Sequence, residues 1–197
     1  MRKAEFIFRE LLFQALEKKQ YSFTQKELSS RLNISLSNVN HALLRLRAMN
    51  AIKVKPMGFS VVNPKKILFY WACSRNLQKD IVYSTRAALP VMREIEKNMP
   101  ADAIFTAYSG FKFKFNDAPA DYSEVYVYAA DLDEMHKRFP PSKKQPNLFV
   151  LQCDAIMQSY GNIAPIGQLF ADLWNLPEWY AMDFLKALEA EIDALLE

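Results

Sequence analysis

Apolar residues at helical spacing predict three helices in the first part of the chain. The helices are expected over residues 3–18, 25–32 and 36–50, because apolar side chains recur every three or four residues within each range. The T-x-x-E motif that starts at Thr24 is a capping box, in which hydroxyl and carboxylate satisfy backbone N–H groups reciprocally. Asn33 tolerates the left-handed conformation that ends a helix. The second and third helices are therefore joined by a short turn.

The third helix has two chemically different faces, and Ser35 caps its N-terminus. The helical count places these apolar residues on one face: Leu36, Val39, Leu43 and Leu46. It places these polar residues on the opposite face: Ser37, Asn38, His41 and Arg45. Leu44 is expected to be exposed, whereas Arg47 lies closer to the apolar side and is expected to pair within this part of the chain. Two short helices joined in this way are typical of a helix-turn-helix.

A strand-like alternation follows the three helices. Apolar residues and lysines alternate over 52–55, residues 56–58 are turn formers, and residues 59–62 are suited to a returning strand. This pattern predicts a short β-hairpin. The order of three helices and a hairpin resembles the winged-helix family over residues 4–63.

The charge distribution agrees with a nucleic-acid-binding N-terminal part. Residues 28–79 contain no Asp or Glu. Residues 1–66 hold 13 Lys and Arg against 4 Asp and Glu, whereas residues 67–197 hold 12 against 18. A surface that faces phosphates excludes carboxylates, so this split favours a basic DNA-binding end attached to a more acidic body.

The winged-helix resemblance implies that the third helix enters the major groove of double-stranded DNA. The expected DNA-binding residues are Lys26, Ser35, Ser37, Asn38, Asn40, His41, Arg45, Lys53 and Lys55. Side chains of the third helix would approach base edges, and the lysines would contact phosphates. Many such regulators read paired half-sites, so a homodimer is plausible. The alternative is a winged helix that binds protein instead of DNA.

The rest of the chain alternates helices and strands, which predicts an α+β protein. Residues 65–80 are expected to form a connecting helix between a winged-helix domain, 1–64, and a sheet domain, 81–197. The expected strands are residues 81–84, 103–109, 124–129 and 147–153. The expected helices are residues 90–99, which start at Pro90, then 132–139, capped by Asp131, 166–175 and 178–196.

The C-terminal part resembles the nucleotidyltransferase-like domain that some prokaryotic regulators attach to winged helices. The segments that carry this resemblance are AIFTAYSG, EVYVYA and APIGQLFADLWNLPEWYAMDFLKAL. The similar group is the abortive-infection antitoxins of type IV toxin–antitoxin systems and their archaeal relatives. The resemblance implies an antitoxin-like transcriptional regulator whose second domain binds a ligand or a partner protein, such as a toxin.

The residues that a nucleotidyltransferase needs are incomplete. Catalysis requires a small-residue turn and two carboxylates one residue apart on a strand, which hold magnesium. Here the turn reads Tyr108-Ser109-Gly110 and the strand reads Glu124-Val125-Tyr126. Asp121 would point to the opposite face from Glu124 on an extended strand. We expect no enzyme activity, no catalytic residue and no cofactor. The alternative is an active nucleotidyltransferase that uses Glu124 with a second carboxylate from elsewhere.

The remaining chemistry-bearing residues indicate structural roles. Cys73 and Cys153 are expected to be free thiols, and two histidines without a CxxC pair give no metal site. Gln168 and Asp172, one helical turn apart, either make a structural contact or line a pocket. No apolar run reaches the roughly 18 residues of a membrane span, and the N-terminus lacks signal-peptide features. The chain is therefore expected to be cytoplasmic.

Overall fold

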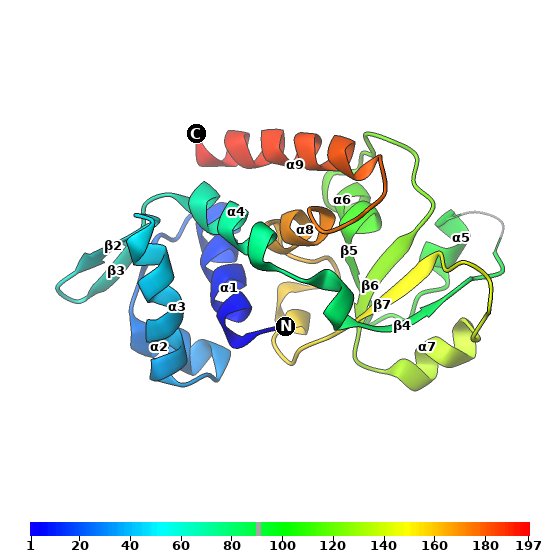
Figure 1. The fold of residues 1–197 in the computed structure, drawn as a ribbon, viewed down its shortest axis with the longest axis horizontal. Helices are drawn as coiled ribbons and strands as arrows, with labels where there is room; N and C mark the ends of the chain where they lie inside the picture. The colour runs from blue at the N-terminus through cyan, green and yellow to red at the C-terminus, as the bar shows by residue number, and fades with distance from the viewer. Residues whose placement is uncertain (90–91) are drawn as a thin grey trace.

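The computed structural model describes residues 1–89 and 92–197, and within them the protein is α+β. These residues form nine α-helices, a three-stranded sheet and a four-stranded sheet. Figure 1 shows the small sheet with its hairpin at one end of the molecule and the larger sheet at the other. Pro90, where the sequence predicts a helix start, lies outside the described residues.

The N-terminal lobe (residues 1–63) contains three helices and the small sheet. Its helices are α1 (Lys3–Glu17), α2 (Gln25–Leu32) and α3 (Leu36–Ala48). Its strands are β1 (Ser22–Phe23), β2 (Ile52–Lys55) and β3 (Gly58–Val61), in the order β1-β3-β2 with antiparallel pairing. The three helices and the hairpin confirm the predicted elements. Strand β1 was not predicted, because a two-residue strand leaves no periodic pattern.

The helix caps at Thr24 and Asn33 are formed as the sequence predicts, but the contact of the Glu27 side chain differs from the prediction. The Thr24 hydroxyl accepts a hydrogen bond from the backbone N–H of Glu27 (3.1 Å), and Asn33 is left-handed with φ 50°. The expected return contact from Glu27 to Thr24 is not formed. Its carboxylate instead accepts a hydrogen bond from Arg31 at 2.9 Å, because an ion pair at i, i+4 holds the carboxylate on the helix surface.

The prediction for Leu36 is wrong. Val39, Leu43 and Leu46 are buried as expected, but Leu36 is 52 % exposed. Side chains on a helix lean toward its N-terminus. Leu36 is the first helical residue, so its side chain leans beyond the packed turns and stays half exposed.

The C-terminal lobe (residues 75–197) is built on the four-stranded sheet. Its strands are β4 (Ile81–Thr85), β5 (Ile104–Thr106), β6 (Val125–Ala129) and β7 (Leu148–Gln152). The order is β4-β7-β6-β5, in which β6 and β7 are parallel and the outer pairs are antiparallel. The helices are α5 (Met92–Lys97), α6 (Ala107–Phe115), α7 (Leu132–Arg138), α8 (Ile166–Leu173) and α9 (Ala181–Leu196). Single 3₁₀ turns lie at Leu77–Asp80 and Met157–Tyr160.

Two boundaries in this lobe differ from the predictions. The strand expected over 103–109 ends at Thr106, and α6 begins at Ala107 with a positive φ of 51°. Gly110 lies inside that helix, where a Cβ would come within 2.5 Å of Leu169 and 3.0 Å of the Phe105 carbonyl oxygen. Glycine there permits close helix packing and does not form a loop. Helix α9 begins at Ala181, three residues later than expected.

The connecting helix α4 (Pro64–Ser74) joins the two lobes through packing. One buried apolar cluster includes residues from both lobes and from α4, such as Leu46, Trp71 and Phe170. Figure 1 shows α4 crossing α1 and α8 on its way from the hairpin to the larger sheet. A smaller cluster fills the other face of that sheet, beneath α5 and α7. The core is therefore continuous across the predicted domain boundaries.

A buried polar network lies where α1, α4 and α8 meet. The Arg75 guanidinium donates to Asp172 (2.7 Å), to Glu5 (2.8 Å) and to the Tyr128 hydroxyl (2.9 Å). Gln168 donates to Asp172 at 2.9 Å, and both side chains are fully buried. This confirms the structural interpretation of the Gln168–Asp172 pair.

Both cysteines, Cys73 and Cys153, are free thiols. None of the described helices has both the length and the apolar character that crossing a bilayer requires.

Candidate nucleic-acid interface

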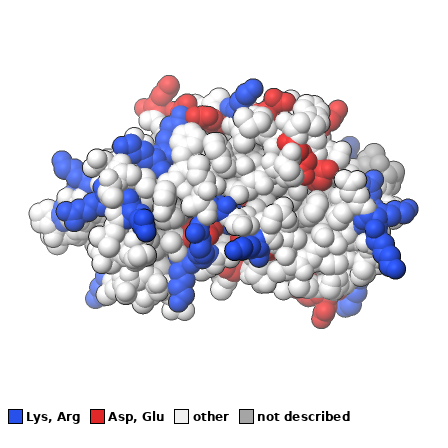
Figure 2. All heavy atoms as spheres, in the orientation of Figure 1, with Lys and Arg blue, Asp and Glu red and all other residues white. Residues whose placement is uncertain are grey.

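The outer side of α3 and the adjoining hairpin form one exposed surface, which we call the α3–hairpin face. It consists of Lys26, Ser37, Asn38, Asn40, His41, Leu44, Arg45, Arg47, Lys53 and Lys55. All are exposed except Asn38, which is half-buried. Figure 2 shows Lys and Arg side chains over this end of the molecule as well as in the middle and at the opposite end, whereas Asp and Glu side chains are seen only away from the hairpin end in this view. The face thus unites residues from α2, α3 and the hairpin.

Five cations on this face have no carboxylate partner. In residues 1–89 and 92–197, no ion pair involves Lys26, Arg45, Arg47, Lys53 or Lys55. The internal pairing expected for Arg47 is therefore wrong, since its side chain is exposed beside the hairpin. Unpaired cations of this kind are available to neutralise the phosphates of a nucleic acid.

Two basic residues outside this face, Lys65 and Arg31, are paired with carboxylates. Lys65 pairs with Glu189 (3.1 Å) and Asp193 (2.7 Å) on α9. Arg31 pairs with Glu10 (2.7 Å) and Glu27 (2.9 Å). Lys65 and Arg31 are thus neutralised by carboxylates, unlike the five cations of the α3–hairpin face.

Two of the predicted DNA-binding residues, Ser35 and Asn38, are hydrogen-bonded to each other. The Ser35 hydroxyl accepts hydrogen bonds from the backbone N–H of Asn38 (3.3 Å) and from its side-chain amide (2.8 Å). Ser35 is therefore first a helix cap, and it orients the Asn38 amide at the start of α3. The Asn38 carbonyl oxygen remains available as an acceptor on the exposed face.

The polar side chains of α3 lie on both sides of a central ridge. At 3.6 residues per turn, Ser37, His41 and Leu44 lie along one line on the helix surface. Asn40 and Arg47 flank that line on the hairpin side, where both line the pocket beside β2. Asn38 and Arg45 flank it on the other side. Exposed side chains therefore lie along the central line of α3 and on both sides of it.

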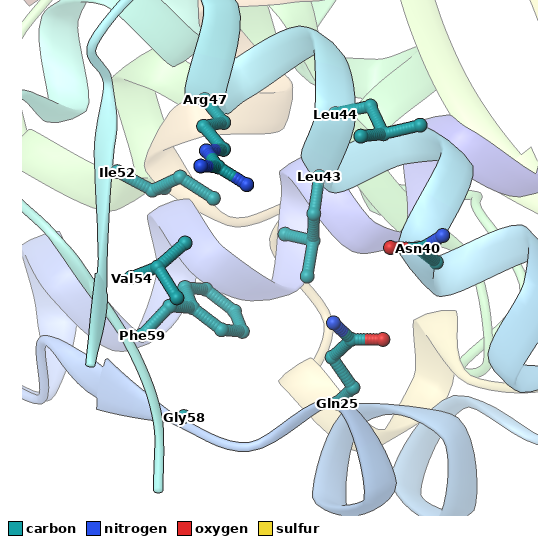
Figure 3. A pocket seen from close by; sticks show the side chains of 9 residues that line it. All are labelled: Gln25, Asn40, Leu43, Leu44, Arg47, Ile52, Val54, Gly58 and Phe59. Atoms are coloured by element: carbon teal, nitrogen blue, oxygen red, sulfur yellow. The ribbon is translucent and has the colours of Figure 1, made fainter. Parts of the chain in front are cut away.

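A pocket of about 140 Å³ separates α3 from the hairpin (Figure 3). Apolar side chains form its walls: Leu43, Leu44, Ile52, Val54 and Phe59. Gln25, Asn40 and Arg47 supply the polar groups, and Figure 3 shows the Arg47 guanidinium directed between Ile52 and Leu43. Sequence reasoning did not identify Gln25 as part of this surface, because its place beside β3 depends on tertiary packing.

The hairpin is held in position by its pairing with β1. Gly58 of β3 lies so close to the neighbouring strand β1 that a Cβ would come within 2.2 Å of the Phe23 carbonyl oxygen. Its φ of 153° also disfavours other residues. The Ser22 and Ser60 hydroxyls share a hydrogen bond of 3.0 Å across the same pair of strands. This pairing sets the position of the two lysines of β2 relative to α3.

A second cluster of polar groups lies around Glu124 in the C-terminal lobe. Glu124 accepts a hydrogen bond from the Tyr180 hydroxyl. Glu178 accepts hydrogen bonds from Tyr108 (2.9 Å) and Tyr126 (3.2 Å). Burial raises the pKa of Glu124 above its ordinary value, and the nearby Glu178 carboxylate adds to that rise. The carboxylates here are thus surrounded by phenol groups.

The arrangement differs from a metal-binding carboxylate pair. Tyr126 follows Glu124 by two residues, and its hydroxyl is a hydrogen-bond donor to Glu178. Among the described residues, no group of three or more His, Cys, Asp or Glu side chains could hold a metal ion.

No protein-family model matches this sequence, and it matches neither a curated protein nor a solved structure.

Proposed function

We propose that the protein is a sequence-specific DNA-binding transcriptional regulator whose N-terminal lobe is a winged helix. In this proposal α3 enters the major groove and the β2–β3 hairpin lies against the phosphate backbone beside it. The observation that carries the proposal is the α3–hairpin face, with its five unpaired cations and no carboxylate. An ordinary exposed surface mixes charges of both signs, whereas a phosphate-binding surface favours cations alone.

The polar residues of α3 supply the chemistry that sequence recognition requires. Asn38, Asn40 and His41 carry hydrogen-bonding groups at the exposed surface of a single helix. Such groups read base edges, while lysine and arginine contacts to phosphate fix the register. Lys53 and Lys55 on the hairpin are placed for the second role.

We further propose that the C-terminal lobe is a nucleotidyltransferase-like domain without catalytic activity, as in antitoxin-type regulators. Glu124 and Glu178 both accept hydrogen bonds from tyrosine hydroxyls, and Tyr126 stands in place of a metal-binding carboxylate. The lobe would then bind a ligand, a second subunit or a partner protein. Its packing against α1 and α4 gives such binding a direct route to the DNA-binding lobe.

The test is a selection from a randomised pool of duplex DNA with the full-length protein. Sequencing of the bound fraction is expected to reveal an enriched motif. The Asn38→Ala/His41→Ala variant should lose the part of this enrichment that these two side chains read, while it retains salt-sensitive binding, because its cations are unchanged. A Gln145→Ala variant, which changes an exposed amide on the C-terminal lobe, serves as the matched control and should select the same motif as the wild type.

Two other outcomes would contradict this proposal. Binding without enrichment would leave a phosphate-binding protein and remove sequence specificity from the account. An absence of binding at low salt would refute the DNA-binding function and favour a winged helix that recognises protein.

A further inference from the structure

The central line of α3 is polar at Ser37 and His41 and becomes apolar from Leu44 on, although the edges of the α3–hairpin face are cationic. Leu44 lies on the central line of α3 and is 52 % exposed. Ala48, one turn further along the helix, is also exposed. A large aliphatic side chain at this position contributes nothing to phosphate binding. If the proposed function is correct, Leu44 is the large apolar side chain on the line of α3 that faces the groove.

Asn40 lies one turn before Leu44 on the same helix. Residues four apart on a helix are surface neighbours, with Cβ atoms about 5–6 Å apart. Both side chains also line the pocket between α3 and the hairpin, and Figure 3 shows them on successive turns of α3. The face therefore presents an amide and a branched apolar group side by side.

This pair of groups matches the major-groove edge of an A·T base pair. Adenine offers an acceptor and a donor that an Asn amide satisfies with two hydrogen bonds, and thymine offers a methyl group. Guanine is usually read by Arg or Lys. On α3 Arg45 lies on the opposite flank from Asn40, and the Arg47 guanidinium is directed between Ile52 and Leu43 (Figure 3).

We infer that the Asn40–Leu44 pair makes the protein selective for A·T base pairs, with Leu44 in contact with a thymine methyl group. The inference rests on the proposed DNA-binding function and extends it to the class of sequence that is bound. Removal of one contacted methyl group should lower the affinity about fourfold, because burial of one methylene-sized group contributes that much to binding.

The experiment compares three duplexes of about 24 base pairs, slightly more than two helical turns. They are alternating d(AT), the same duplex with dU in place of every dT, and alternating d(GC). Uracil differs from thymine only in the missing methyl group, so the d(AT)/d(AU) affinity ratio isolates the apolar contact. Fluorescence anisotropy titrations give this ratio for the wild type and for each variant.

The wild type is expected to bind d(AT) most tightly, with a d(AT)/d(AU) ratio of about four or more. Leu44→Ala should bring that ratio close to one, and Leu44→Met should preserve it because Met retains an apolar contact. Met182→Ala is the matched control, since Met182 is an exposed apolar residue on α9, away from the α3–hairpin face. It should leave the ratio unchanged.

The outcomes separate this inference from the proposed function. Tight binding with the same ratio in the wild type and Leu44→Ala, or a preference for d(GC), would overturn the A·T inference and leave DNA binding intact. Absence of binding to all three duplexes at low salt would overturn both.

Discussion

Replacement of Arg75 by Met tests whether the buried network joins the two lobes. Arg75 is fully buried and forms a 2.7 Å ion pair with Asp172, which is also fully buried. A second pair, at 2.8 Å, reaches Glu5 on α1. Met fills much of the same volume, so Arg75→Met removes the charge with little change in packing.

The expected loss in the free energy of unfolding depends on the carboxylates that remain buried when Arg75 is replaced. Removal of one partner from a buried ion pair costs about 3–5 kcal/mol, because the other charge stays buried without compensation. Glu5 keeps its ion pair with Arg2 (2.8 Å). Asp172 keeps hydrogen bonds from Thr106 (2.7 Å), Tyr128 (2.7 Å) and Gln168 (2.9 Å) but loses its charged partner, so the loss falls mainly on Asp172. We therefore expect the free energy of unfolding to fall by about 3–5 kcal/mol.

Urea unfolding followed by tryptophan fluorescence measures this change. With a slope of about 2 kcal/mol per molar urea, the midpoint should fall by about 2 M. Arg138→Met is the matched control, because its ion pair with Glu134 is exposed and should contribute at most about 1 kcal/mol. Arg75→Met/Asp172→Asn should recover part of the loss, since the buried charge is removed while the amide oxygen can still accept from Thr106 and Tyr128. A loss below about 1 kcal/mol in Arg75→Met would refute the reasoning.

Three further predictions concern the acid sensitivity of the fold and its local geometry. Burial opposes ionisation of Glu5, but its ion pairs and hydrogen bonds outweigh burial and lower its pKa below 4.5. Its contribution to stability is therefore lost as the pH falls below that value, and Glu5→Gln should flatten the acid limb of urea-unfolding free energy against pH. Gly58→Ala should lower the free energy of unfolding by about 1–3 kcal/mol, because the new Cβ meets the Phe23 carbonyl oxygen. An unchanged urea midpoint would show that the strands can separate there without cost. Ser35→Ala should cost about 1 kcal/mol through loss of the α3 cap, and equal urea midpoints for variant and wild type would contradict that role.

Elements with local signals could be predicted from the sequence. The second and third helices follow from their caps at Thr24 and Ser35 and from apolar periodicity, and Asp131 caps α7 as expected. The hairpin follows from alternation around a turn. Each of these signals lies within a few residues of the structure that it determines.

Features that depend on distant contacts could not be predicted. Arg75 meets Asp172 across 97 positions and Glu5 across 70, and nothing near Arg75 indicates either partner. The exposure of Leu36 and the close approach at Gly58 likewise depend on where helices and strands end in space. At the candidate site, the sequence predicted the exposed face of α3 but not the pocket that separates it from the hairpin.

The salt dependence of DNA affinity tests the central claim most directly. Five cations of the α3–hairpin face would contact phosphates, so log K against log salt should have a slope of about −4 to −5 for duplex DNA. Lys53→Ala/Lys55→Ala should reduce this slope by about two. The matched control, Lys143→Ala/Lys144→Ala, removes two exposed lysines from the C-terminal lobe and should leave the slope unchanged. Equal slopes for the wild type and the hairpin variant, or an equal loss in both variants, would contradict DNA binding through this face.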